Sequence, residues 1–269
     1  DFAEAEVDQR QLNFTRFPLF FPERRAFFLE DSGVFEYGGL TTSSRTRGLS
    51  RPVLPFFSRR IGRDTLGRSV PILLAAKIAG RHGKTSMGFI DAVLEDHQGL
   101  GMQNTFAGRV ARDVFEQSSI GMISTAGNPN ASTDNMVFGP DFRYRTAGVG
   151  NGQVFEANLF ALGSHSDGSE NPAGHAYGAS LAYPNDFFRA HAQFVEISEH
   201  FDPALGFVQR KQTRGYYTYA SINPRPERPE WLRQYRMAYN TEHYTDIQNR
   251  LETALHRITP LWLEFNSGD

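Results

Sequence analysis

The sequence has no cysteine and no long hydrophobic run, and each absence excludes a class of protein. Without cysteine there is no disulfide framework, no thiolate metal site and no cysteine nucleophile. No stretch approaches the roughly 18 apolar residues of a transmembrane helix, and no basic and apolar signal peptide precedes the rest. The formal net charge of −2 over 269 residues selects neither nucleic acid nor an anionic surface as a partner.

Motifs of common enzymes and metal sites are also absent. The sequence has no HExxH zinc helix and no GxSxG nucleophile turn. Its basic residues are dispersed, without the clustered stripe of a nucleic-acid-binding protein. The histidines show no metal-ligand spacing and lie at positions 82, 97, 165, 175, 191, 200, 243 and 256. We therefore predict no metal site, no cofactor and no nucleic-acid partner.

A few groups of polar residues remain as weaker candidates for chemistry. Three groups combine a histidine with carboxylates and are interpreted as solvated side chains. Two lie at strand ends (Glu199, His200 and Asp202; Glu242, His243 and Asp246), and one lies in a loop (His165, Asp167 and Glu170). Hydrolysis by two carboxyls requires a set separation between them in space, which spacing in the sequence does not show. The pairs available for it are Glu23 with Glu30 and Asp91 with Glu95.

From residue 53 onward, stretches of alternating polarity are separated by turn signals. This pattern is typical of half-buried β-strands, and about ten residues is the length of a tilted strand that crosses a membrane. It predicts strands over 53–61, 70–80, 84–95, 103–112, 117–126, 134–145, 153–163, 174–183, 187–198, 214–223, 231–243 and 249–258, and the start of another at 261.

The predicted connections between these strands alternate in length. Longer ones fall at 62–69, 96–102, 127–133, 164–173 and 199–213, and shorter ones at 81–83, 113–116 and 184–186. Two connections, 146–152 and 224–230, break the alternation because they are as long as some of the long set. Short turns at one end and long loops at the other are typical of outer-membrane barrels.

The two faces of the predicted strands differ most clearly in residues 231–243. One face carries Tyr235, Met237 and Tyr239, and the other carries Gln234, Arg236, Asn240 and Glu242. An arginine on a lipid face costs roughly 2 to 4 kcal/mol at mid-depth, so we expect the polar face to point into a lumen. Residues 84–95 differ, because Met87, Phe89 and Val93 share one face with Asp91 while Gly88, Ile90, Ala92 and Leu94 form a second apolar face.

Aromatic residues near the predicted strand ends are candidates for the girdles that flank the apolar band of a membrane barrel. They are Tyr144, Tyr183, Phe187, Phe188, Tyr216, Tyr217, Trp231 and Tyr244. A soluble β-sandwich or open barrel is the alternative, because half-buried strands also alternate and β-propensity favours aromatics anyway.

Residues 1–52 lack the alternation and are predicted to form an irregular plug-like segment. Pro18 and Pro22 discourage a helix before residue 22, and residues 38–52 read as a flexible polar loop. Charged residues stand among the aromatics of this segment and of residues 56–63: Glu23, Arg24, Arg25, Glu30, Arg59 and Arg60. They are interpreted either as a surface that holds an anionic or sugar ligand or as an ion-pair network that pins the segment inside a barrel, because buried charges need partners.

Three stretches resemble the DUF5916 family of bacterial proteins. They are residues 13–30 (NFTRFPLFFPERRAFFLE), 57–62 (FSRRIG) and 201–208 (FDPALGFV). Residues 71–77 (PILLAAK) are similar to the first long hairpin of that family, and the start of the chain is similar to the beginning of its domain. Ala26 stands where the family usually has proline, and Gln209 stands where proline is common.

The resemblance implies an all-β fold, an antiparallel up-and-down meander that is part of a transmembrane outer-membrane-type β-barrel. Residues 53–269 would form the first part of this barrel, behind the plug-like segment. It also implies a bacterial outer-membrane location, outer-membrane lipid as a partner, and an upstream module similar to family 9 carbohydrate-binding modules.

On this basis we expect capture or transport of a ligand, with carbohydrate as a candidate. The alternatives are a barrel-associated hydrolase and a soluble β-rich carbohydrate-binding module. We also expect a signal sequence upstream and a barrel that continues beyond residue 269. Because a half-barrel has open edges with unsatisfied backbone groups, we expect residues 1–269 alone to aggregate or misfold.

Overall fold

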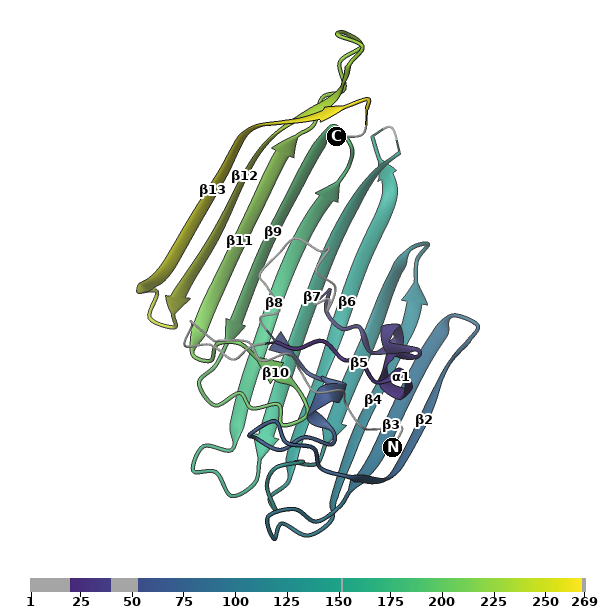
Figure 1. The fold of residues 1–269 in the computed structure, drawn as a ribbon, viewed down its shortest axis with the longest axis vertical. Coiled ribbons are helices and arrows are strands. Elements are labelled where there is room, and N and C mark those ends of the chain that lie inside the picture. The colour runs from purple at the N-terminus through teal and green to yellow at the C-terminus, as the bar shows by residue number, and fades with distance from the viewer. Residues whose placement is uncertain (1–19, 40–52, 151, 268–269) are drawn as a thin grey trace.

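The computed structural model describes residues 20–39, 53–150 and 152–267, which fold into two antiparallel sheets. The larger sheet has eleven strands in the order β13-β12-β11-β9-β8-β7-β6-β5-β4-β3-β2, so strands that are consecutive along the chain lie side by side (Figure 1). β10 leaves this order and pairs with β1 in the second sheet. The predicted all-β antiparallel meander is therefore confirmed.

The elements have the following bounds: α1 (Ala26–Leu29), η1 (Ser32–Phe35), β1 (Val53–Leu54), η2 (Ser58–Arg60), β2 (Ile72–His82), β3 (Thr85–Leu94), β4 (Gln103–Val114), β5 (Ser118–Ala126), β6 (Asn135–Val149), β7 (Gln153–Ser166), β8 (Ala173–Pro184), β9 (Phe188–Ile197), β10 (Phe207–Val208), β11 (Thr213–Ile222), β12 (Leu232–Asp246) and β13 (Leu251–Phe265).

Two details of the strand prediction are wrong. The stretch 53–61 contains only the two residues of β1, because Pro55 has no N–H for a ladder and the chain then turns into the 3-10 helix η2. The strands predicted at 249–258 and from 261 form the single strand β13. Its register against β12 shifts beside Pro260, so a bulge accommodates the proline on this edge strand.

The connections of the larger sheet separate by length. The longer ones, 95–102, 127–134, 167–172 and 198–212, lie at one end of the sheet, and the turns 83–84, 115–117 and 185–187 lie at the other, where β6 ends and β7 begins (Figure 1). The exception expected at 146–152 disappears, because β6 continues to Val149 and β7 begins at Gln153. Two exceptions remain: the loop between β11 and β12, which contains 224–230, is long, and the connection 247–250 between β12 and β13 is short although it lies at the end with the longer connections.

One face of the larger sheet, here called the inner face, contacts the plug-like segment. Within the described residues 20–39 of that segment, Lys77 and Asp141 of this face hydrogen-bond to Phe27 and Gly38, and the Arg109 guanidinium lies 5.3 Å from the centre of the Tyr37 ring. Figure 1 shows α1 and β10 lying across this face, over the half of the sheet nearer the longer connections. The opposite face is called the outer face. Side chains alternate between the two faces along each strand.

Two apolar cores fill the space between the inner face and the segments that cover it. The first core contains Tyr37, Val53, Leu54, Ile123, Val137, Phe160, Leu162, Ala176, Val195, Ile197, Phe201, Phe207, Tyr217 and Tyr219. The second contains Phe28, Ile61, Val70, Ile72, Ile90, Ala92, Leu94 and Leu205. This second core explains why β3 is apolar on both faces, since Ile90, Ala92 and Leu94 pack under Phe28 while the other face points outward.

β2 and β13 are the edges of the larger sheet and do not pair with each other, so the described residues form an open sheet. Within those residues, no helix combines the length and the apolar character needed to cross a membrane. The outer face carries large apolar side chains that are exposed, among them Ile78 at 70%, Leu159 at 54% and Leu181 at 52%.

Candidate functional site: the anchored plug-like segment

The plug-like segment contains a buried ion pair between Arg25 and Glu23. Arg25 donates from Nε and Nη2 to the two carboxylate oxygens of Glu23, at 2.9 and 2.7 Å. The Ser58 hydroxyl donates to Glu23 Oε2 at 2.8 Å, and the Arg25 guanidinium also donates to the carbonyls of Ser58 and Ile61. The side chains of Arg25 and Glu23 are 2% and 9% exposed. This bidentate pair therefore ties residues 23–25 to the turn at 58–61.

The environment of Glu23 strongly favours its ionised form. Burial alone would raise the pKa of this carboxyl, but the hydrogen bonds and charge of Arg25, with the hydroxyl of Ser58, outweigh burial and lower the pKa to about 2. The backbone N–H groups of Arg24 and Arg25 add two hydrogen bonds of 3.0 Å to Glu23 Oε1. The carboxylate is thus fully engaged as a structural anchor.

The two arginines of η2 also bond to backbone carbonyls. Arg59 donates to the carbonyl of Pro22 at 2.8 Å, and its guanidinium lies 5.7 Å from the centre of the Phe21 ring. Arg60 donates to the carbonyl of Gly206 at 2.9 Å, which connects η2 to the loop before β10. Burial lowers the pKa of Arg60, against the opposing charge of Asp202.

Lys77 of β2 fastens the end of α1 to the sheet. Its Nζ donates to the carbonyls of Phe27 and Glu30, both at 2.8 Å, and lies 5.2 Å from the centre of the Phe27 ring. The Glu30 carboxylate is 3.6 Å away, but its side chain is 76% exposed. Glu30 therefore lies at the margin of the cluster, and Arg24 is also exposed.

A second anchor joins the end of the segment to the middle of the inner face. Arg109 of β4 and Asp141 of β6 form a bidentate pair at 2.7 and 2.9 Å, and Asp141 also accepts from the backbone N–H of Gly38 at 3.0 Å. The Tyr37 hydroxyl lies 2.7 and 2.8 Å from the carbonyls of Pro140 and Ala161. Burial and the charge of Asp141 raise the pKa of this tyrosine.

The structure brings together four of the six candidate residues. Glu23, Arg25, Arg59 and Arg60 bond to the chain itself, in a network that holds the segment in place. The pair of Arg109 and Asp141 was missed, because its members are 32 positions apart and only the strand pairing brings them together. The signal available in the sequence was that Arg109 and Asp141 carry opposite charges within predicted strands, so that the two could pair if both pointed to the inner face.

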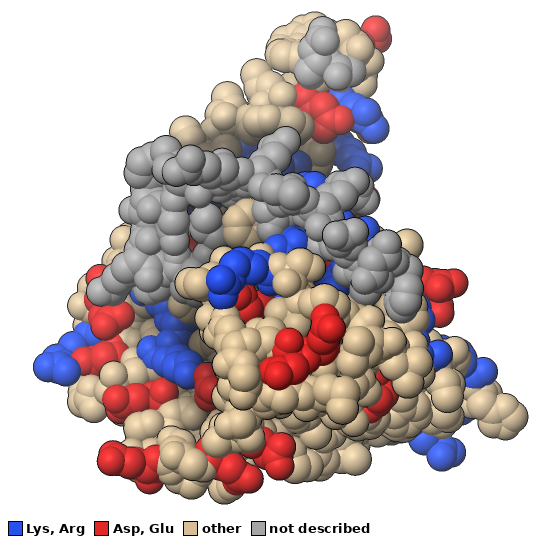
Figure 2. All heavy atoms as spheres, turned by 60° about the horizontal axis from the view of Figure 1, so that its bottom comes forward, with Lys and Arg blue, Asp and Glu red and all other residues tan. Residues whose placement is uncertain are grey.

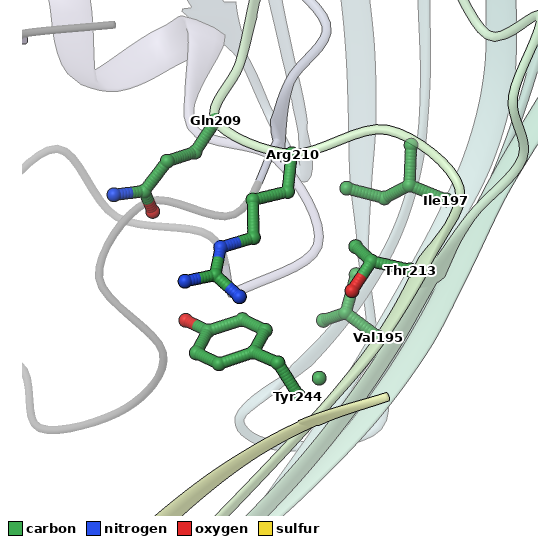
Figure 3. Close-up of a pocket in the computed structure, with 7 residues that line it drawn as sticks. Val195, Ile197, Gln209, Arg210, Thr213 and Tyr244 are labelled. Atoms are coloured by element: carbon green, nitrogen blue, oxygen red, sulfur yellow. The ribbon is translucent and has the colours of Figure 1, made fainter. Parts of the chain in front are cut away.

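A cavity between residues 209–210 and the strands β9, β11 and β12 is too small for an organic ligand. It measures about 10 Å³, roughly the space of one water molecule. Figure 3 shows its lining, in which the Arg210 guanidinium lies over the Tyr244 ring at 4.1 Å. The residues that line it are Val195, Ile197, Gln209, Arg210, Thr213, Gly215 and Tyr244.

A larger hollow lies at the turn between β8 and β9. It is an open groove of about 710 Å³, lined by Gln153, Tyr183, Pro184, Asn185, Asp186, Phe187 and Phe188. The Asn185 side chain connects this turn to β7. Its Oδ1 accepts from the backbone N–H of Val154 and its Nδ2 donates to the Val154 carbonyl, both at 2.8 Å. The groove carries a single carboxylate, that of Asp186, which lies 3.6 Å from Arg189.

The weaker candidates do not assemble into a site within the described ranges. No group of three or more histidine or carboxylate side chains there is placed to hold a metal ion. His165 pairs with Asp167 at 3.1 Å and Asp202 pairs with Lys211 at 2.7 Å. At the end with the longer connections, lysine and arginine lie interspersed with aspartate and glutamate, without a large patch of one sign (Figure 2).

Comparison with known proteins gives one match. Residues 1–119 match the sequence model of a family described as "Domain of unknown function (DUF5916)", which confirms the resemblance seen in the motifs. No curated protein and no solved structure matches this chain. The matched range includes the plug-like segment, η2 and the strands β2 to β4, and ends at the beginning of β5.

Proposed function

We propose that this chain, whose residues 1–119 carry the DUF5916 domain, forms part of the wall of an outer-membrane β-barrel that captures or transports a polar ligand. The observation that carries the proposal is the outer face of the larger sheet. Its exposed side chains are apolar in the middle of consecutive strands, from Ile78 on β2 to Ile258 on β13. Apolar surface on this scale favours contact with lipid over contact with water.

Two lines of aromatic side chains bound this apolar band. One line, nearer the longer connections, consists of Phe89, Phe106, Phe138, Tyr177, Phe194 and Tyr216, with ring centres 5.2 to 6.4 Å apart where they are neighbours. The other, nearer the short turns, consists of Tyr144, Phe155, Tyr183 and Phe188. The lines are six residues apart on β8 and β9, which is about 20 Å at 3.3 Å per residue. With strands tilted by roughly 35–45°, this span corresponds to about 15 Å of height, which fits within the lipid-facing band of about 25 Å of a membrane barrel.

The two aromatic lines cross the strands obliquely. In a barrel whose strands are tilted, residues at the same depth in the membrane lie along such oblique lines. Tyr177 of β8 pairs with Glu196 of β9, but the aromatic residue on β9 is Phe194, two residues nearer the short turns. Beyond the first line the outer face becomes polar, with His165 on β7 and His175 on β8. The expectation that Tyr217 and Tyr244 belong to a girdle is wrong, because both side chains point to the inner face. Tyr217 is part of the first core, and Tyr244 packs against it.

The inner face supports a polar lumen in the part of the sheet nearer the short turns. Arg143 and Arg145 of β6 lie 3.8 and 3.4 Å from Glu156 of β7. Across the sheet, Arg236 of β12 donates to Asn223 at 2.9 Å. Charges on this face and apolar groups on the other are the arrangement of a membrane barrel, whereas a soluble sandwich places the apolar face inward. A polar ligand, with sugars as the candidate class, would pass or bind along this inner face.

Closing such a barrel requires further strands. Neighbouring strands run in opposite directions, and with eleven strands the two edges β2 and β13 run in the same direction. These edges therefore do not pair antiparallel with each other. A closed antiparallel barrel that contains this sheet needs an odd number of additional strands, which gives the even total of bacterial single-chain barrels.

The test is fractionation of the full-length protein, followed by gel mobility in detergent with and without heating. We expect the protein in the outer-membrane fraction and a faster-migrating form in the unheated sample, since closed barrels stay folded in the gel. Ligand binding would then be measured with sugars and with inorganic anions. A protein that stays in solution without detergent and shows no mobility shift would refute the barrel and favour a soluble β-rich module.

A further inference from the structure

Two histidines on the outer face of β12 and β13 have their ring nitrogens close together. Nε2 of His243 lies 3.2 Å from Nε2 of His256, and the ring centres are 4.9 Å apart with an interplanar angle of 61°. His243 pairs with Ala254 and His256 pairs with Thr241, so the two histidines are diagonal neighbours on adjacent strands. The residues are 13 positions apart, so no sequence motif reports their proximity.

The geometry of this pair is that of a chelate. Two imidazole nitrogens bound to one zinc ion, each at about 2.05 Å, are about 3.2 Å apart when the angle at the metal is about 100°. With both rings pointing at the ion, the same angle places the ring centres about 5 Å apart. A single ion position is thus consistent with both observed distances, 3.2 Å between the nitrogens and 4.9 Å between the ring centres.

A third residue orients one of the rings. The Tyr239 hydroxyl lies 2.7 Å from Nδ1 of His256, on the far side of that ring from His243. When Nδ1 carries the proton and donates it to the tyrosine oxygen, the Nε2 lone pair of His256 is left for a metal ion. A hydrogen bond to the second ring nitrogen is the usual companion of a metal-binding histidine.

We propose that His243 and His256 form a binding site for a divalent transition-metal ion, with Tyr239 as the positioning residue. Imidazole pairs suit zinc, nickel and copper. Both histidines are partly or fully exposed, so an ion reaches them from solvent and keeps its remaining positions for water or a further ligand. The site lies beside Tyr216, which pairs with His243, so it continues the first aromatic line. It does not depend on the barrel proposal.

The experiment measures metal binding to full-length protein, freed of metal and purified without a polyhistidine tag. Titration with Zn²⁺ and Ni²⁺ by calorimetry gives the affinity, and the Cu²⁺ form gives the number of coordinated nitrogens by electron paramagnetic resonance. We expect two imidazole nitrogens on Cu²⁺, and a loss of affinity of tenfold or more in each of His243→Ala and His256→Ala. Tyr239→Phe should weaken binding severalfold, because the ring of His256 loses its orientation.

His165→Ala is the matched control, since His165 is also an exposed outer-face histidine but pairs with Asp167 instead of another ring. It should leave the affinity of this site unchanged. If a histidine variant fails to fold, the nitrogen count on the unmodified protein still decides. A single coordinated nitrogen, or affinities that are equal in the control and in both histidine variants, would overturn the proposal and leave a simple hydrogen bond between the two rings.

Discussion

Replacing Glu23 by glutamine tests whether the charge cluster anchors the plug-like segment. The pKa of Glu23 is about 2 in the folded chain against an ordinary value of 4.5, a difference that corresponds to about 3 kcal/mol of stability. The substitution also leaves the Arg25 side chain, 2% exposed, without its carboxylate, and an unpaired buried charge is strongly destabilising. We expect the segment to detach more easily by about 3 kcal/mol, roughly a hundredfold in the opening equilibrium.

Hydrogen exchange followed by mass spectrometry measures this opening directly, in peptides that contain residues 20–37 of the detergent-solubilised protein. The control is Glu30→Gln, which changes the same residue type in the same segment. Because the Glu30 side chain is 76% exposed and 3.6 Å from Lys77, its substitution should cost less than about 0.5 kcal/mol. Equal protection in the two variants would show that the Glu23 pair does not hold the segment.

The pH dependence gives a second check on the same residue. The folded-state pKa of Glu23 is depressed, so its contribution is complete above about pH 5 and is lost as the pH falls toward 2. The stability difference between the unmodified chain and Glu23→Gln should therefore shrink below pH 4.5 and vanish near pH 2. A difference that stays constant between pH 7 and pH 3 would contradict the assigned pKa.

Three further substitutions, two of them paired with a control substitution, test the second anchor, its backbone and the outer face. Asp141→Asn should destabilise the fold by about 3 to 5 kcal/mol in urea unfolding, because it leaves a buried arginine without its partner. Gly38→Ala should cost more than Gly83→Ala, although both glycines have positive φ, because a Cβ at Gly38 would lie 2.8 Å from Phe160 and one at Gly83 meets nothing within 4 Å. Thermal unfolding of these two variants makes the comparison. Leu181→Arg on the outer face should lower folding into lipid vesicles by roughly 2 to 4 kcal/mol, whereas Ala182→Arg on the inner face should be tolerated; equal effects would argue against a lipid-facing surface.

The strands could be predicted because period two is a local property of the sequence. The alternation in 231–243 gave both faces of β12 correctly, with Met237 and Tyr239 outward and Asn240 and Glu242 inward. The girdle was harder to predict, because a shift of one residue reverses the face of every side chain. Tyr216 and Tyr217 are adjacent and both aromatic, so only one of them points outward, and the register decides which.

The candidate site was predictable in composition but not in arrangement. Residues of both signs among aromatics indicated a cluster, and the bond between Glu23 and Arg25 spans only two positions. The partners of Arg60 and Asp141 come from far along the chain: the carbonyl of Gly206 is 146 positions from Arg60, and Gly38 is 103 positions from Asp141. No local pattern encodes such contacts, because they depend on how the segment crosses the finished sheet.

Glycines on the inner face lie where other segments of the chain pass close to the sheet. A Cβ at Gly139 of β6 would lie 2.7 Å from the Tyr37 hydroxyl, and a Cβ at Gly88 of β3 would lie 2.8 Å from Val34. At Gly174 of β8 it would lie 2.3 Å from the backbone of Phe201, in the loop before β10. Glycine weakens a strand, so its presence at these positions indicates close approach of another segment. The sheet and the plug-like segment are therefore complementary in shape as well as in charge, which is why we treat the segment as an integral part of the fold.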